Sequence, residues 1–268
     1  MGSLRGYTLW MVAATFFLVI AGGMVTSTGS ALAVPDWPLS FGKFFPKMEG
    51  GVFYEHGHRM IAASVGLFTI ILAFWLSRRA EEPLLKNAGW VALALVCAQG
   101  ILGGITVLLK LPAVTSVGHA CLGQIFFSWM CGIAAMAWSD PIAAAYPEAA
   151  KLRRLAIMTT SFVLFQLLFG AIYRHTGMML HVHFLGAALV FVHVLLLFKR
   201  IQKTAPSDVW LAGPAKLLTV LLFAQIALGF WTWQRPTIDN ATAHVAVGAL
   251  LLATSFVISL ETYRRVQV

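Results

Sequence analysis

Eight long apolar segments, separated by charged or proline-rich breaks, constrain this chain more than any other feature of its sequence. A helix needs about 20 mostly apolar residues to cross the hydrocarbon core of a bilayer. Lipid offers the backbone no hydrogen-bond partners, so a segment of this length spans as a helix. We therefore predict an all-α membrane protein with spans at residues 8–28, 58–77, 89–109, 116–138, 155–173, 179–198, 211–232 and 241–260.

The composition agrees with this class. Hydrophobic residues make up 59% of the chain and charged residues 11%, whereas a soluble domain has about 45–50% and about 25%. The net charge of +9 comes from basic residues in short loops between the spans, which argues against a nucleic-acid partner. Because Cys97, Cys121 and Cys131 all fall inside apolar segments, we expect small core residues and no disulfide or metal site.

The distribution of Lys and Arg predicts the orientation. Thirteen of these residues lie at one set of span ends and six at the opposite set. The richer side is expected to face the cytoplasm, so both termini should be cytoplasmic. Every even-numbered span then begins at the outer face of a cell (inner or plasma) membrane. The segment Met1–Tyr7 has no cleavage site behind it, so we expect the first span to stay as an anchor.

The chain contains an internal repeat of four spans. From His58 to His119 there are 61 residues, and from His183 to His244 there are 61 again. The matching segments are Glu55–Ala63 with Leu180–Ala188, Ala98–Gly103 with Ala224–Gly229, and His119–Gly123 with His244–Gly248.

The repeat predicts two parallel halves. The first and fifth spans also match, through Gly22 and Gly170 and through Thr28 and Thr176, at an offset of 148 instead of 125. The first copy therefore has 23 extra residues, in the outer loop from residue 30 to residue 54. A repeat of four spans keeps its orientation, which argues against a transporter built from inverted repeats. We expect one half at residues 1–139 and the other at 140–268.

Four histidines hold matched positions near the outer start of the even-numbered spans: His58, His119, His183 and His244. An ionisable residue inside a span is costly and usually marks function. Within each half the two helices run the same way, so their histidines lie at similar depth and could ligate a haem iron from both sides. Hydrogen-bonded packing is the plainer alternative, but a register preserved across a repeat argues against it. Zinc would require four converging ligands.

The remaining histidines fit the ligand pattern less well. His56 and His181 point about 200° away from their neighbouring ligands on an ideal helix, so we expect them beside the sites or at the interface. His175 is expected in a loop. His193 lies deeper in its span and is expected to be a satisfied core residue.

The two halves differ beside the first histidine pair. Glu55 precedes His58 by three residues, on the same helix face, and its counterpart is Leu180. Arg59 likewise has the apolar counterpart Phe184. A carboxylate beside a macrocycle can handle protons or stabilise positive charge, and an arginine can pair with haem propionates. The alternative is an ion pair that only ends a helix. This asymmetry suggests that the first half reacts and the second carries electrons.

These residues together resemble the haem A synthase family. The likeness covers nearly the whole chain, and the Glu-x-x-His-Arg element with its ordered partner histidines is fairly specific. It is carried by Val25–Ser30, Val34–Pro38, Tyr54–Arg59, Gln99, Gly103–Val107 and His119, and more weakly by Arg174–Gly177, His183 and His244.

The resemblance implies a reaction and a role for each ligand pair. Haem O would become haem A, for use in terminal oxidases, by two hydroxylations of a ring methyl and loss of water from the diol. His58 and His119 would hold the substrate haem, with Glu55 as the catalytic carboxylate. His183 and His244 would hold a permanent haem b.

One departure from the family concerns the outer loop. Many members carry a cysteine pair there, whereas residues 31–45 of this chain contain no cysteine. The loop could still cover the first haem through Trp37, Phe41, Phe44 and Phe45, or these side chains could anchor the loop at the membrane interface.

Two other functions remain open from the sequence. A di-haem b-type cytochrome could exchange electrons with quinone, although a transmembrane wire usually needs haems near both faces. A haem transporter or chaperone would explain one exchangeable and one fixed haem. Contact with a haem O synthase is expected from pathway logic alone, an electron acceptor such as quinone is undefined, and a homo-oligomer is left open.

Overall fold

A computed structural model describes residues 2–139, 144–146 and 148–267 of the chain. These residues form eight helices, each long and apolar enough to cross a membrane, and every predicted span lies within one of them to within one residue. Their bounds are α1 Gly2–Ser27, α2 Gly51–Arg79, α3 Pro83–Leu108, α4 Ala113–Trp138, α5 Ala149–Thr176, α6 Leu180–Thr204, α7 Val209–Gln234 and α8 Ile238–Arg265.

Local sequence signals explain where several helices begin and end. Pro83 opens α3, where its missing N–H costs nothing. Thr237 and Asn240 form a reciprocal capping box at the start of α8. Gly177 ends α5 in the left-handed conformation, with φ 73°, which only glycine adopts without strain. This sharp stop allows α6 to begin three residues later.

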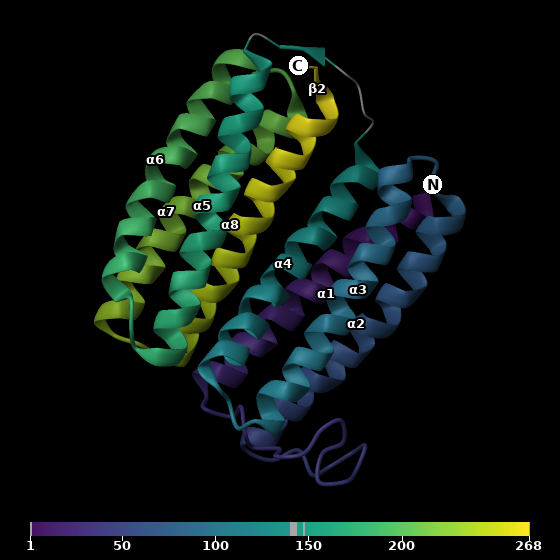
Figure 1. Ribbon diagram of the computed structural model, residues 1–268, viewed down its shortest axis with the longest axis vertical. Coiled ribbons are helices and arrows are strands. Elements are labelled where there is room, and N and C mark those ends of the chain that lie inside the picture. The colour runs from purple at the N-terminus through teal and green to yellow at the C-terminus, as the bar shows by residue number, and fades with distance from the viewer. Residues whose placement is uncertain (1, 140–143, 147, 268) are drawn as a thin grey trace.

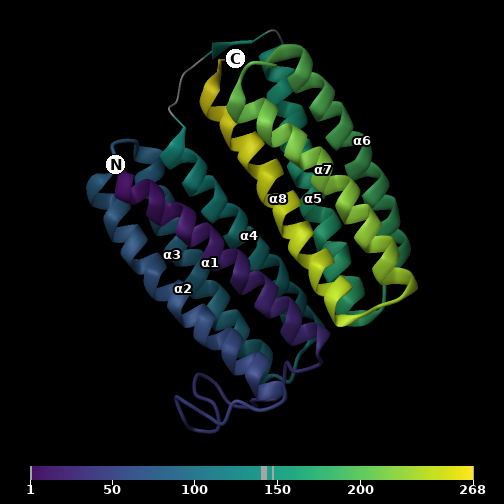
Figure 2. The same ribbon diagram turned by 180° about the vertical axis from the view of Figure 1, so that it is seen from behind.

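The helices pack in two groups of four, α1–α4 and α5–α8 (Figure 1). The groups meet along α4 and α8, and α1 also contacts α8 (Figure 2). At this seam a Cβ on Gly132 would lie 2.7 Å from the Phe256 ring, so the glycine lets α4 and α8 approach closely. The start of α1 and the end of α8 lie at one end of the bundle, here called the terminal end. The loop of residues 30–50 lies at the opposite end, here called the loop end.

A short strand pair closes the terminal end. Strand β1, Ala144–Ala145, pairs in parallel with β2, Val266–Gln267. We expect the boundary between the halves to fall between residues 139 and 140. Residues 140–143, which include Asp140 and Pro141, lie outside the described residues.

Two sequence expectations are wrong at this level. His175 lies in the last turn of α5 instead of a loop, because the helix continues beyond the apolar span to its glycine cap. Cys97 is exposed on α3 instead of lying in the core. A lipid-facing surface is as apolar as a core, so hydropathy could not separate the two locations.

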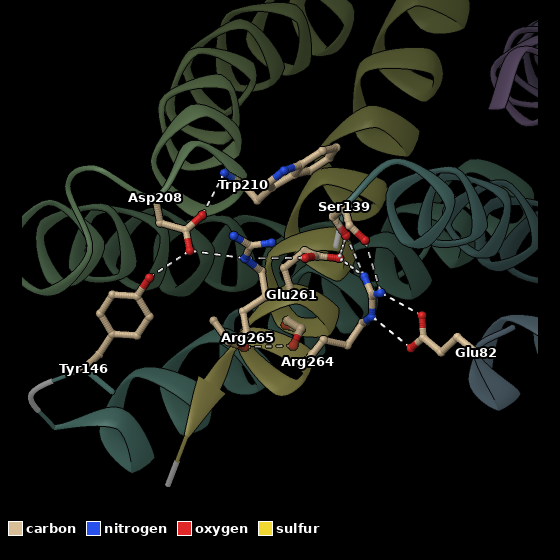
Figure 3. A network of polar contacts seen from close by, with 10 residues as sticks. Glu82, Ser139, Tyr146, Asp208, Trp210, Glu261, Arg264 and Arg265 are labelled. Carbon is tan, nitrogen blue, oxygen red and sulfur yellow. Dashed lines mark hydrogen bonds and ion pairs between the residues drawn. The ribbon is translucent and has the colours of Figure 1, made fainter. Parts of the chain in front are cut away.

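A buried ionic network joins the two groups at the terminal end (Figure 3). Arg264 of α8 forms ion pairs with Glu82, at 2.8 Å, and with Glu261, also at 2.8 Å. It also donates to the Ser139 hydroxyl, 2.6 Å away. Because Glu82 and Ser139 belong to the first group of helices, this arginine connects the groups through charge as well as packing.

Replacing this arginine should loosen the bundle. Arg264→Ala would leave Glu261, which is fully buried, without its closest cation. Removing one partner of a buried ion pair costs about 3–5 kcal/mol, so we expect a clearly lower unfolding temperature in detergent. The control is Lys47→Ala, whose ion pair with Glu49 is exposed and should contribute little. Equal unfolding temperatures for the two variants would contradict a stabilising role for the network.

Candidate functional site

Each helix hairpin places one histidine ring against a glycine of the preceding helix. The four rings belong to the four histidines singled out in the sequence, and all lie toward the loop end. A Cβ on the facing glycine would lie 2.8–3.1 Å from a ring carbon, closer than side-chain atoms normally approach, so the missing Cβ leaves room for the ring. The Cβ–Cε1 distances would be 3.1 Å for Gly22–His58, 2.9 Å for Gly103–His119, 2.8 Å for Gly170–His183 and 3.0 Å for Gly229–His244.

A glutamine four residues before the glycine touches the histidine in three of the four hairpins. Its amide donates to the backbone carbonyl of the histidine at 3.0 Å for Gln99–His119 and 2.8 Å for Gln166–His183, and Gln225 Nε2 lies 3.4 Å from His244 Nε2. In α1 this position is Leu18. The repeated segments alone did not predict this role of Gly and Gln; their four-residue spacing was the available signal.

The second histidine pair has the spacing of a shared metal ligand set. The ring centres of His183 and His244 lie 6.4 Å apart, with the ring planes at 75°. Metal–nitrogen bonds of about 2 Å, plus about 1 Å from each nitrogen to its ring centre, would separate two ligating rings by about 6 Å. His183 Nδ1 lies 3.2 Å from the Gln166 carbonyl oxygen, a contact that orients ligating imidazoles.

The chemistry of these rings also fits haem iron. Nδ1 of His58, His119 and His244 is buried without a hydrogen-bond partner, although buried polar atoms are normally paired. One ring nitrogen of each of these three histidines is therefore left without a hydrogen-bond partner, although the Nε2 atoms of His119 and His244 lie near Gln99 and Gln225. No group of three or more His, Cys, Asp or Glu side chains converges among the described residues. Pairs of imidazoles are the donor set of a six-coordinate haem.

Glu55 and Arg59 bind each other and the loop. Glu55 is buried and pairs through Oε1 with Arg59 Nη2 at 2.6 Å. Its Oε2 accepts from the Val34 amide at 2.8 Å. Arg59 also donates to the carbonyl oxygens of Val34, Asp36 and Leu39, at 3.0, 2.7 and 3.1 Å. The ion pair considered in the sequence analysis is thus present, and it holds the loop to the start of α2.

The ring of Trp37 packs the loop on α3. A Cβ on Gly104 would lie 2.7 Å from the ring of Trp37, so this ring lies on the residue next to the glycine that supports His119. Phe44 and Phe45 are 75% and 81% exposed, as an interfacial anchor requires.

Asp36 accepts from the amides of Phe41 and Gly42. The Gly42 amide, followed by that of Phe41, lowers the pKa of the Asp36 carboxyl.

The other histidines have separate environments. His56 is buried, and its Nδ1 lies 2.8 Å from the Ser40 hydroxyl, so it holds the loop. His181 is exposed at the start of α6. His193 packs against Phe162, with ring centres 4.3 Å apart, and its Nδ1 lies 2.9 Å from the Leu189 carbonyl oxygen.

Comparisons with known proteins point to one family. A family model described as cytochrome oxidase assembly protein (COX15-CtaA) matches residues 5–182. A haem A synthase of Symbiobacterium thermophilum is 27% identical over 261 residues, covering 85% of each chain. The haem A synthase of Geobacillus thermodenitrificans is 26% identical over 133 residues, 49% of this chain and 41% of its own. That of Shouchella clausii is 27% identical over 126 residues, 46% and 42%.

The glycine contact makes a direct prediction. Gly103→Ala places a Cβ 2.9 Å from His119 Cε1, so the ring must shift and haem binding at the first pair should fall. Gly100→Ala, three residues earlier in α3, meets nothing within 4 Å and should bind as the parent does. Haem content and the bis-histidine absorption spectrum of the purified variants measure the effect. Equal haem content in two well-folded variants would show that the contact does not position the ring.

Proposed function

The chain belongs to the COX15-CtaA family of cytochrome oxidase assembly proteins, and on this premise we propose how its two halves share the work of a haem A synthase. This is an oxidoreductase family that converts haem O. We assign the substrate haem to the half at residues 1–139, between His58 and His119. A haem b is assigned to the half at residues 140–268, between His183 and His244.

The observation that carries this proposal is the matched set of four imidazoles. Each ring lies on a glycine of the preceding helix, and the second pair has a separation suited to one iron. The shared arrangement supports two four-helix repeats with one haem site each. A haem b bound in the second half would supply one-electron chemistry.

Glu55 is the residue we assign to the reaction itself. Oxidation of a ring methyl to a formyl group requires two hydroxylations, and the diol then loses water. Glu55 lies one helical turn from His58 and is held by Arg59 and by the Val34 amide. A carboxylate fixed in this way is suited to stabilise positive charge that develops beside it. Arg59 positions Glu55 and holds the loop; propionate binding by Arg59 would require these contacts to change.

We further propose that both sites lie toward the outer face of the cell membrane. All four histidines lie toward the loop end, whereas the excess of Lys and Arg lies toward the terminal end. The positive-inside rule then places both termini in the cytoplasm. Four haem ligands near one face are also poorly arranged for electron transfer across the membrane, which needs haems near both faces. A haem O synthase as supplier and a quinone as electron acceptor are proposals from the chemistry of the reaction.

The test is analysis of the haem products. The parent, Glu55→Gln and Glu49→Gln would each be made in cells that supply haem O, and the extracted haems identified by mass. We expect haem A or its hydroxylated precursor from the parent and from Glu49→Gln, whose carboxylate is exposed. Glu55→Gln should retain haem O and make at least about 100-fold less product, as when a charge-stabilising group is removed.

Each alternative predicts a different result. Haem b alone in the parent, with haem O abundant, would favour the electron-carrying cytochrome. Haem O bound without any oxidised product would favour a transporter or chaperone. Normal product from Glu55→Gln would remove Glu55 from the reaction while leaving the synthase function intact.

A further inference from the structure

Arg174 lies between the two groups of helices at the loop end. It belongs to the last turn of α5, and it donates through Nη2 to the Ser27 hydroxyl, at 2.6 Å, and to the Gly23 carbonyl oxygen, at 3.1 Å. Both acceptors belong to α1. Its Nη1 donates to the Ala241 carbonyl oxygen of α8 at 3.3 Å. The guanidinium is therefore held at a fixed place where the two groups meet.

This guanidinium has no anionic partner among the described residues. Its three acceptors are neutral, whereas Arg59, Arg264 and Arg265 each pair with a Glu or Asp. A partly buried cation in an apolar bundle is costly unless an anion balances it. A carboxylate bound beside Arg174 would balance this charge.

The neighbours of Arg174 indicate which group this is. Gly170 lies one turn earlier on the same face of α5 and supports the ring of His183. Ala241 lies three residues before His244 in α8, again on one face. Arg174 therefore lies about one turn beyond the second histidine pair, on the side nearer the loop end. A haem between those rings would direct its two carboxylates toward that side, because its other edges are apolar.

We propose that Arg174 binds a propionate carboxylate of the haem held by His183 and His244. The inference rests on the proposed function insofar as it needs a haem in the second half. A guanidinium forms strong charge-assisted hydrogen bonds to a carboxylate. It also stabilises the less positive state of a nearby iron, so it raises the reduction potential of that haem.

The internal repeat shows how the two halves differ at the position of Arg174. The position of Arg174 corresponds to Thr26 in the first half, by the offset that aligns Gly170 with Gly22. The first half has Arg59 instead, and Glu55 already neutralises it. A cation in the second half that no described carboxylate neutralises suits a haem that stays bound. Its absence from the first half suits a substrate that must enter and leave.

The test compares natural haem with its propionate dimethyl ester. Each would be added to the haem-depleted full chain in detergent, for the parent, Arg174→Gln, Arg174→Lys and Arg235→Gln. Arg235 is an exposed arginine at the same end of the bundle, so its variant is the matched control. We expect the parent and the control to bind the dimethyl ester about tenfold or more weakly than haem at the second pair, as for the loss of one charged hydrogen bond.

Arg174→Gln should lose this preference and show a lower midpoint potential for the haem that it retains. Arg174→Lys should keep part of the preference and most of the potential, because it keeps the charge. An unchanged preference in Arg174→Gln would overturn the proposal and leave the arginine as a contact between helices. His183→Ala removes the second pair, so haem binding at the first pair can be measured alone. If Arg174→Gln abolished the preference for haem over its ester only at the first pair, the assignment to the second haem would be overturned.

These outcomes are separable from a failure of the proposed function. Absence of oxidised haem in the parent, together with a propionate preference that depends on Arg174, would reject the synthase while supporting the carboxylate site. Normal haem A production without that preference would support the synthase and reject the carboxylate site.

Discussion

The approach of an imidazole ring to a helix glycine is the contact on which both proposed haem sites depend. A helix surface normally keeps a neighbour at the distance of its Cβ atoms, and the missing Cβ of Gly22, Gly103, Gly170 and Gly229 allows each ring to lie closer. The ring is then held by the backbone of a packed helix, which moves less than a side chain. Three glutamines add hydrogen bonds or contacts to this support. The 6.4 Å separation of the second ring pair follows from this packing.

An apolar bundle also requires that every charge be balanced. At the terminal end, Arg264 is surrounded by Glu82, Glu261 and Ser139, so a buried cation becomes a connection between the two groups of helices. At the loop end, Glu55 neutralises Arg59. Arg174 differs because its partners are neutral. The same residue type thus stabilises the fold in two places, and in the third we assign it to a ligand.

The two halves use one scaffold under different constraints. A half that handles a substrate needs a reactive group and a way for the haem to exchange. We assign these to Glu55 and to the loop that Arg59, His56 and Trp37 hold in place. A half that keeps its haem needs additional binding contacts, and Arg174 would provide one through a propionate carboxylate. The division of labour that we propose rests on a few aligned positions at which the halves differ, such as Thr26 with Arg174 and Glu55 with Leu180.

The sequence by itself determined the eight spans, the alignment of the four histidines and the likeness to a family, because span length, hydropathy and residue spacing are properties of the chain alone. It did not reveal that both oxygens of Glu55 are engaged, that Arg59 binds loop carbonyls or that Arg174 reaches α1. It also misplaced His175 and Cys97. Each of these depends on which helix face meets which neighbour, and packing between segments distant in the sequence decides that.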